Sequence, residues 1–272
     1  MKIVLDCAHG ATYQVAPYVF KELGADITTI GVEPDGLNIN KGVGSTSPEA
    51  LVEKVLETGA DLGIAFDGDG DRVVMVDHKG DVVDGDELIY IIAKNRKNAG
   101  RLTGGVVGTL MTNYGAEMAF NDLGIPFVRA NVGDRYVMEH LVKNDWQLGG
   151  EGSGHIICFD KSTTGDAIIA ALQVLIAIWR ENKTLHQLKS EMSKLPQVLK
   201  NVRIKEKINP MENETIAAAV AEQSERLAGQ GRVLLRSSGT EPLIRVMAEG
   251  TDAALVNSVV DSLVETVTRA MG

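Results

Sequence analysis

The stretch LGIAFDGDGDRVVMVD, from Leu62 to Asp77, gives the strongest indication of the fold. Two apolar runs enclose three aspartates, Asp67, Asp69 and Asp71, which are separated from one another only by glycine. Short apolar runs bounded by glycine predict buried strands, and α/β folds place ligands in loops at the carboxyl ends of such strands. We therefore expect an α/β protein with a functional loop at residues 67–72, called here the aspartate loop.

The aspartate loop predicts a site for one hard divalent cation per chain. Clustered carboxylates repel one another, and a ligand set made only of oxygen favours Mg²⁺ before Ca²⁺. An EF-hand is excluded, because its sixth position requires glycine and its twelfth glutamate, where this sequence has Arg72 and His78. Arg72 is placed to hold a phosphate oxygen. The alternative is a solvated acidic turn.

Apolar strands alternate with amphipathic helices around this loop, which predicts the organisation of the whole chain. We expect two consecutive α/β domains with mixed sheets, covering residues 1–82 and 83–194. A small α+β C-terminal domain is expected at residues 197–272. Residues 78–81 predict the turn of a hairpin, and segment 163–183, apolar nearly all round, predicts a helix buried within the second domain.

Composition limits the classes of partner. The chain of 272 residues carries 27 Lys and Arg against 37 Asp and Glu, a formal net charge of −10. This charge argues against nucleic acid and against an anionic membrane surface as partners. The two cysteines, Cys7 and Cys158, provide no disulfide framework, and no apolar run has the length of a membrane span. We therefore expect a cytoplasmic protein.

A second polar loop, GGEGSGHIICF at residues 149–159, is called here the glycine-rich loop. Glu151, Ser153 and His155 occupy alternate positions, so we expect their side chains to share one face. A carboxylate beside a hydroxyl suits the vicinal hydroxyl groups of a sugar. A plain glycine turn is the alternative.

A third polar loop, LLRSSGTEPLIRV at residues 234–246, combines hydroxyl groups, a glycine and two arginines. Such a combination predicts an anion site for a phosphate group, although an ordinary connecting loop remains the alternative. The candidate phosphate residues are Arg236, Ser237, Ser238, Gly239, Thr240 and Arg245. Arg135, at the start of another expected helix, is a further candidate cation, with a surface salt bridge as its alternative.

These three loops, in this order, resemble those of the α-D-phosphohexomutase superfamily. The segments LDCAHGAT, GGVVGTLM and VGDRYV resemble it as well, and the likeness covers essentially all 272 residues. The resemblance implies that the three expected domains are the family's second, third and fourth, which carry the metal, sugar and phosphate loops. Gly152 departs from the family, which usually has asparagine or glutamine there, so a looser glycine-rich loop is expected.

The likeness is strongest to the bacterial enzymes of the superfamily that act on glucosamine phosphate. It implies interconversion of glucosamine 6-phosphate and glucosamine 1-phosphate through a phosphoserine and a glucosamine 1,6-bisphosphate intermediate or activator, for UDP-N-acetylglucosamine and cell-wall synthesis. It implies Mg²⁺ on the aspartate loop, sugar hydroxyls on the glycine-rich loop and a clamped phosphate on the third loop.

The resemblance also implies a phosphoserine, followed by histidine, in a first domain. None of the five histidines here follows a serine. We therefore expect a fragment whose partners are a phosphosugar and the missing N-terminal domain of the same protein, inactive alone, with a homodimer left open. The alternatives are a phosphomannomutase or phosphoglucomutase, a phosphatase that uses Asp67 as nucleophile and Asp69 as acid/base, or a non-catalytic sugar-phosphate binding module.

Overall fold

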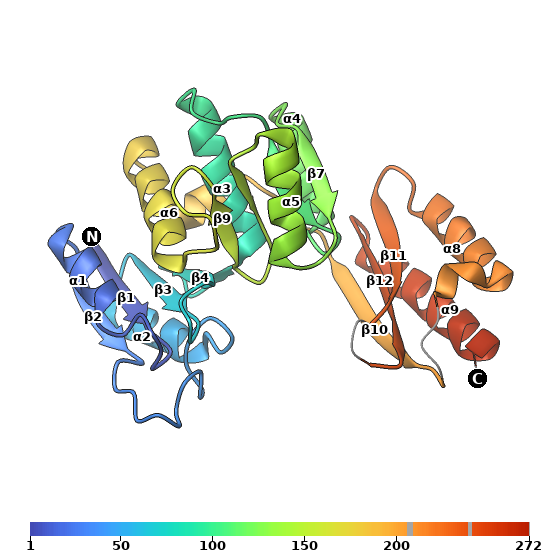
Figure 1. The fold of residues 1–272 in the computed structure, drawn as a ribbon, viewed down its shortest axis with the longest axis horizontal. Coiled ribbons are helices and arrows are strands. Elements are labelled where there is room, and N and C mark those ends of the chain that lie inside the picture. The colour runs from blue at the N-terminus through green and yellow to red at the C-terminus, as the bar shows by residue number, and fades with distance from the viewer. Residues whose placement is uncertain (206–208, 239–240, 272) are drawn as a thin grey trace. The chain divides into compact units, whose positions relative to one another are not determined.

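The computed structural model describes residues 1–205, 209–238 and 241–271 (Figure 1). The chain separates into two compact units, which are described one at a time: unit 1 is Met1–Thr112 with Ala116–Ser193, and unit 2 is Asn113–Gly115 with Lys194–Gly272. The division into three domains stays a prediction. None of the described helices is both long and apolar enough to cross a membrane.

The first sheet of unit 1 has five strands in the order β2-β1-β3-β4-β5. The strands are β1 (Lys2–Asp6), β2 (Asp26–Ile30), β3 (Leu62–Phe66), β4 (Val73–Asp77) and β5 (Val82–Val83). The first three run parallel, whereas β4 and β5 run antiparallel to their neighbours, so the prediction of a mixed sheet is confirmed. The pairing of β4 with β5 also confirms the predicted turn at residues 78–81.

Two helices, α1 (Val15–Glu22) and α2 (Glu49–Thr58), cover opposite faces of this sheet. Phe20 of α1 packs in a cluster with Ile3 and Leu5, whereas Leu51 of α2 packs in a cluster with Val4. Alternate residues of a strand point to opposite faces, so β1 supplies both clusters. Burial on both faces explains why β3 reads as a continuous apolar run.

The second sheet of unit 1 has the order β7-β6-β8-β9. Its strands are β6 (Val106–Thr109), β7 (Phe127–Ala130), β8 (Leu148–Gly150) and β9 (Ile156–Cys158). The helices of this part are α3 (Gly85–Asn98), α4 (Tyr114–Asp122), α5 (Asp134–Asn144), α6 (Ala167–Glu181) and α7 (Leu185–Lys189). Val137 and Leu141 of α5 pack on Val107, whereas α3 and α6 share a core cluster with Val106. The sheet therefore carries helices on both faces.

Helix α6 lies within the predicted segment 163–183 and begins after Asp166, whose side chain accepts a hydrogen bond from the Ile169 N–H at 2.9 Å. The prediction that the helix is buried all round is wrong for one face. Trp179 is 79% exposed, and it borders an apolar hollow of about 460 Å³ that Phe20 and Leu23 also line. An apolar sequence alone does not show which face a neighbouring element leaves uncovered.

Unit 2 is a three-stranded antiparallel sheet in the order β10-β12-β11, packed against two helices. Its elements are β10 (Gln197–Arg203), the short 3₁₀ helix η1 (Pro210–Glu212), α8 (Glu214–Arg226), β11 (Gly231–Ser237), β12 (Leu243–Gly250) and α9 (Ala253–Met271). Strands β11 and β12 pair around the third polar loop. The α+β arrangement expected for the C-terminal part is confirmed.

Candidate functional site

The aspartate loop joins the carboxyl end of β3 to β4 and is organised around Asp67. One carboxylate oxygen, Oδ1, accepts hydrogen bonds from the backbone N–H groups of Gly70, Asp71 and Arg72 at 3.1, 3.1 and 3.0 Å. Gly70 has a φ of +79°, which a residue with a side chain rarely adopts. The turn thereby curls around Asp67, and within the described residues no backbone N–H donates to its other oxygen, Oδ2.

The three aspartates of this loop meet as the sequence predicts. Oxygens of Asp67, Asp69 and Asp71 all lie within 4.8 Å of one another. Burial, followed by the adjoining carboxyl of Asp71, raises the pKa of Asp67. The Asp71 Oδ1 atom is buried without a hydrogen-bond partner among the described residues.

One side chain of opposite charge lies beside these aspartates. The Arg72 Nε lies 3.9 Å from Asp67 Oδ2 and 4.0 Å from Asp71 Oδ1. A single guanidinium offsets only part of the charge of three carboxylates. Oxygen-only donors, a buried oxygen without a partner and this excess of negative charge together fit a hard divalent cation.

Residues 8–11, which follow β1 and to which the sequence assigned no role, contact the aspartate loop. The Ala11 N–H donates to the Gly68 carbonyl oxygen at 2.8 Å. A Cβ on Gly10 would lie 2.2 Å from the same oxygen, so only glycine fits there. Two preceding residues, Ala8 and His9, adopt positive φ angles of 53° and 49°. Backbone strain of this kind clusters at functional sites.

The glycine-rich loop contacts the aspartate loop directly within unit 1. The His155 Nδ1 lies 3.0 Å from Asp71 Oδ2, and the His155 side chain is buried rather than open to a ligand. Arg72 and His155 form an isolated β-bridge, and the Val73 N–H donates to the Gly154 carbonyl at 3.0 Å. The two loops are therefore joined by both side-chain and backbone contacts.

The alternating arrangement expected for the glycine-rich loop is interrupted, because residues 152–153 form a turn. Glu151 turns towards another segment, where its Oε1 accepts a hydrogen bond from the Gly133 N–H at 2.8 Å. Ser153 is exposed. The three side chains therefore have different surroundings, and the assignment of Glu151, Ser153 and His155 to a sugar stays a prediction.

Gly152 does not leave the glycine-rich loop loose. Its carbonyl oxygen accepts a hydrogen bond from the Gly85 N–H at 3.1 Å. A Cβ at position 152 would lie only 3.1 Å from an Asp86 carboxylate oxygen, closer than most such contacts. The absence of a side chain at this position therefore gives space to Asp86.

In unit 2 the two arginines of the third loop lie opposite each other. Arg236 on β11 pairs in register with Arg245 on β12, and the Nε atoms of both are buried without a partner among the described residues. Burial, followed by the charge of Arg245, lowers the pKa of Arg236. Two like charges placed directly opposite are unfavourable unless an anion accompanies them.

The remaining predicted phosphate residues are only partly described. Ser237 ends β11, and the buried Ser238 accepts a hydrogen bond on its hydroxyl from the Glu241 N–H at 3.3 Å. Gly239 and Thr240 lie outside the described residues. Arg135 makes the surface ion pair that the sequence left as an alternative, with Glu139 at 3.1 Å, and its side chain is 81% exposed.

A second group of potential metal ligands, Asp77, Asp81 and His186, was not found from the sequence. The Lys189 Nζ lies 3.0 Å from oxygens of both aspartates, and the Lys79 Nζ lies 3.0 Å from His186 Nε2. Because lysine can only donate, His186 Nε2 accepts and its Nδ1 donates to Asp77 at 2.8 Å. Ammonium groups already offset these carboxylates, so the group is an ion-pair network.

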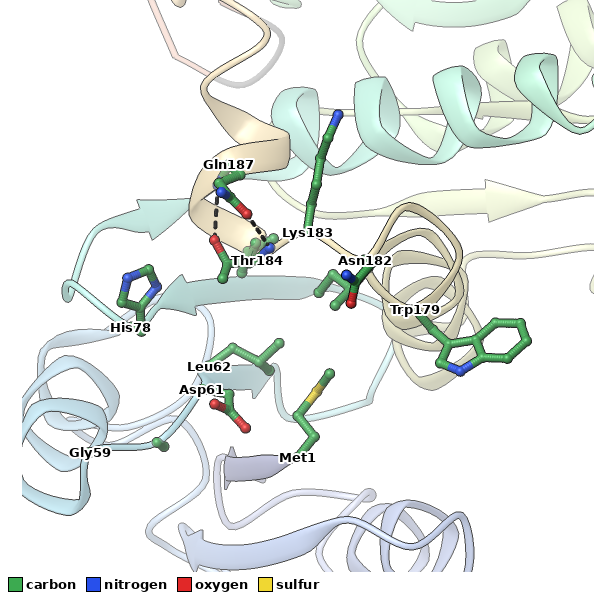
Figure 2. A pocket seen from close by; sticks show the side chains of 13 residues that line it. Met1, Gly59, Asp61, Leu62, His78, Trp179, Asn182, Lys183, Thr184 and Gln187 are labelled. Atoms are coloured by element: carbon green, nitrogen blue, oxygen red, sulfur yellow. Dashed lines mark hydrogen bonds between the residues drawn. The ribbon is translucent and has the colours of Figure 1, made fainter.

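None of the predicted site residues lines the cavity drawn in Figure 2. Its volume is about 740 Å³. Asp61 and Leu62, at the amino end of β3, line one side, and Thr184 and Gln187 line another. The aspartate loop follows the opposite, carboxyl end of β3. The cavity is therefore separate from the candidate metal site.

Comparison with known proteins gives the class of this chain. Family models described as phosphoglucomutase/phosphomannomutase match in three parts: α/β/α domain II at residues 1–80, α/β/α domain III at 84–195 and the C-terminal domain at 199–266. The chain belongs to the phosphoglucomutase/phosphomannomutase family. The resemblance inferred from the three loops is confirmed at this level.

Curated relatives share one description. The chain is 67% identical over 267 residues to a phosphoglucosamine mutase of Hahella chejuensis, covering 98% of this chain and 60% of the relative. It is 59% identical over 268 residues to a phosphoglucosamine mutase of Pseudomonas putida, with the same coverage of 98% and 60%. The chain thus spans about three fifths of the length of the curated relatives that it matches.

Solved structures share the fold. An N-acetylphosphoglucosamine mutase of Aspergillus fumigatus, in complex with GlcNAc-6P and magnesium, matches with a TM-score of 0.81 and 20% identity, covering 100% of this chain and 62% of that one. An N-acetylglucosamine-phosphate mutase of the α-D-phosphohexomutase superfamily, in a product complex, matches with a TM-score of 0.79 and 20% identity, covering 98% and 61%.

Proposed function

We propose that this chain supplies three domains of a phosphoglucosamine mutase, an enzyme that interconverts glucosamine 6-phosphate and glucosamine 1-phosphate. The observation that carries the proposal is the three-aspartate cluster, which contains a buried oxygen without a partner in the described part of the chain and is joined to the glycine-rich loop through His155. The choice of glucosamine is supported by the relatives at 59% to 67% identity that carry this description.

Asp67, Asp69 and Asp71 are proposed to hold one Mg²⁺, for which their oxygen donors and compact spacing are suited. When bound, the ion would supply positive charge that offsets the carboxylates and the charge of a transferring phosphoryl group. The backbone N–H groups on Asp67 Oδ1 keep this carboxylate oriented before any ion binds.

The other residues are proposed to hold the substrate. Arg72, exposed at the end of the aspartate loop, would hold an oxygen of the reacting phosphate. Glu151 would accept hydrogen bonds from sugar hydroxyls, with Ser153 beside it, and His155 would fix Asp71. These contacts would set the distance and direction of phosphoryl transfer.

The third loop is proposed to hold the phosphate that does not react. Arg236 and Arg245 present two guanidinium groups whose buried Nε atoms have no partner among the described residues. Ser237, Ser238, Gly239 and Thr240 would add hydroxyl and backbone donors. Arg135 is left without a role, because Glu139 already pairs with it.

The phosphoryl carrier is proposed to be a serine of a first domain that this sequence does not contain, because no histidine here directly follows a serine. A 1,6-bisphosphate intermediate that returns a phosphoryl group to that serine completes the proposed cycle. A cytoplasmic location and binding of that first domain belong to the same proposal. A homodimer stays a prediction.

Calorimetry of the purified 272-residue chain with glucosamine 6-phosphate tests the proposal. We expect weak binding that strengthens with Mg²⁺ and is lost in Asp69→Asn, which changes one exposed ligand without removing a core contact. An activity assay on the same chain should show no mutase turnover and no release of inorganic phosphate. Absence of Mg²⁺-dependent binding, robust turnover or steady phosphate release would each overturn the proposal.

A further inference from the structure

The Glu151 carboxylate is held by the backbone of a distant segment. Its Oε1 accepts a hydrogen bond from the Gly133 N–H at 2.8 Å, across 18 positions of sequence. Gly133 is the residue at which α5 begins, and its own carbonyl accepts from the Tyr136 N–H at 3.0 Å. The donor is therefore fixed by a helix end, where partial positive charge favours a carboxylate.

The conformation of Gly133 is one that only glycine adopts easily. Its φ is +125° and its ψ is +139°, a region in which other residues are strained. Space is not the reason, because a Cβ at this position would meet only the Tyr136 ring, at 3.6 Å. An alanine would therefore fit sterically, but it would rotate the backbone and move the N–H away from Glu151.

The main chain of Glu151 is held on both sides as well. The Glu151 N–H donates to the His155 carbonyl at 3.0 Å, and the Glu151 carbonyl accepts from the Gly154 N–H at 3.0 Å. With its backbone and its Oε1 fixed, Glu151 has one carboxylate oxygen, Oε2, that makes no hydrogen bond among the described residues. That oxygen has a defined position from which to meet a ligand hydroxyl.

We propose that Gly133 is a positioning residue, which orients the Glu151 carboxylate so that Oε2 accepts a hydroxyl group of the phosphosugar. This inference rests on the proposed function, since it assigns Glu151 to the sugar. It adds Gly133 to the residues proposed for sugar binding. Neither the motif of the glycine-rich loop nor the ion pair of the nearby Arg135 indicates this residue. It also explains how one carboxylate can select a sugar hydroxyl by direction rather than by charge alone.

Calorimetry of the full chain with glucosamine 6-phosphate and Mg²⁺ tests this role through four variants. Gly133→Ala should bind about tenfold more weakly, the effect expected when one charge-assisted hydrogen bond no longer orients its acceptor. Glu151→Ala should bind at least as weakly, and the double variant should lose no more than Glu151→Ala alone. Gly24→Ala, at a positive φ of 87° with open space around it, is the control and should bind normally.

An NMR measurement checks the hydrogen bond without any ligand. The Gly133 amide proton should shift upfield in Glu151→Gln, because a neutral acceptor polarises the N–H less than a carboxylate does. An unchanged Gly133 resonance would overturn the inference, as would normal binding by Gly133→Ala, or a double variant with additive losses. If the wild-type chain binds no phosphosugar, the proposed function is refuted, and the inference about Gly133 is refuted as well because it rests on that function.

Discussion

Replacing Asp67 by asparagine should separate its structural task, which is to organise the loop, from its proposed task, which is to hold a cation. Asparagine keeps an oxygen in the position of Oδ1, so the N–H groups of Gly70, Asp71 and Arg72 retain their acceptor. The change removes a negative charge from a group whose pKa is raised by burial and by the neighbouring Asp71. The metal-free variant should therefore be at least as stable as the wild type, by up to about 1 kcal/mol.

Binding of Mg²⁺ should show the other task. An ion at one hundred times its dissociation constant stabilises the wild-type chain by about 2.7 kcal/mol. In a folded unit of this size that corresponds to a rise in Tm of about 5 to 10 °C. Asp67→Asn should lose most of this rise, because one of the three carboxylate ligands has gone. Thermal denaturation without Mg²⁺, and then at Mg²⁺ concentrations raised in tenfold steps, measures both the metal-free stability and the rise in Tm.

Two further variants complete the test. Asp67→Ala removes the acceptor of three N–H groups and should cost about 2 kcal/mol even without metal. Asp122→Asn, on the exposed end of α4, is the charge-matched control and should keep the full response to Mg²⁺. An equal rise in Tm for Asp67→Asn and the wild type would show that the aspartate loop does not hold the ion.

Three more outcomes follow from the structure. Burial would raise the pKa of Asp77, but its histidine and lysine partners lower it on balance. Its stabilising effect is therefore present at neutral pH, begins to be lost below about pH 4 and is gone once the pH falls below the lowered pKa. The gap in urea stability between wild type and Asp77→Asn should narrow over that range. Arg236→Gln should leave the free energy of unfolding unchanged or slightly raised, because Arg245 loses a like-charged neighbour. The same variant should bind inorganic phosphate more than tenfold more weakly in calorimetry. Gly10→Ala places a Cβ 2.2 Å from the Gly68 oxygen and should cost about 2 kcal/mol in denaturant unfolding together with weaker Mg²⁺ binding.

The sequence predicts those features of the fold and the site that are formed by residues close together in the chain. The apolar runs on either side of the aspartate loop predict β3 and β4, and both are buried along their whole length. The spacing of Asp67, Asp69 and Asp71 predicts their convergence, because glycines between them allow a tight curl. Arg236 and Arg245 flank one short loop, so a hairpin brings them opposite each other. In each case the information lies within about ten residues.

Contacts between distant segments were not predictable in the same way. His155 was grouped with Glu151 because the two share a loop, yet its ring nitrogen contacts Asp71, 84 positions earlier. The bond between Gly133 and Glu151 depends on where α5 begins relative to β8. No periodicity encodes such pairs, since they arise from how elements far apart in the sequence pack against one another. Gly133 is visible in the sequence, but its positive φ and the acceptor of its N–H appear only in the structure.

The aspartate loop and the third loop each bring like charges close together, negative in the first and positive in the second. The aspartate loop holds carboxylates whose repulsion is only partly offset, and the third loop holds two guanidinium groups directly opposite each other. Each arrangement places like charges close together, and real proteins break such local rules mainly at functional sites. A divalent cation would offset the first and a phosphate anion the second, so the proposed Mg²⁺-dependent phosphosugar enzyme accounts for both. Neutral residues at either place would avoid this repulsion, so the two clusters of like charge are the strongest physical argument for the proposed chemistry.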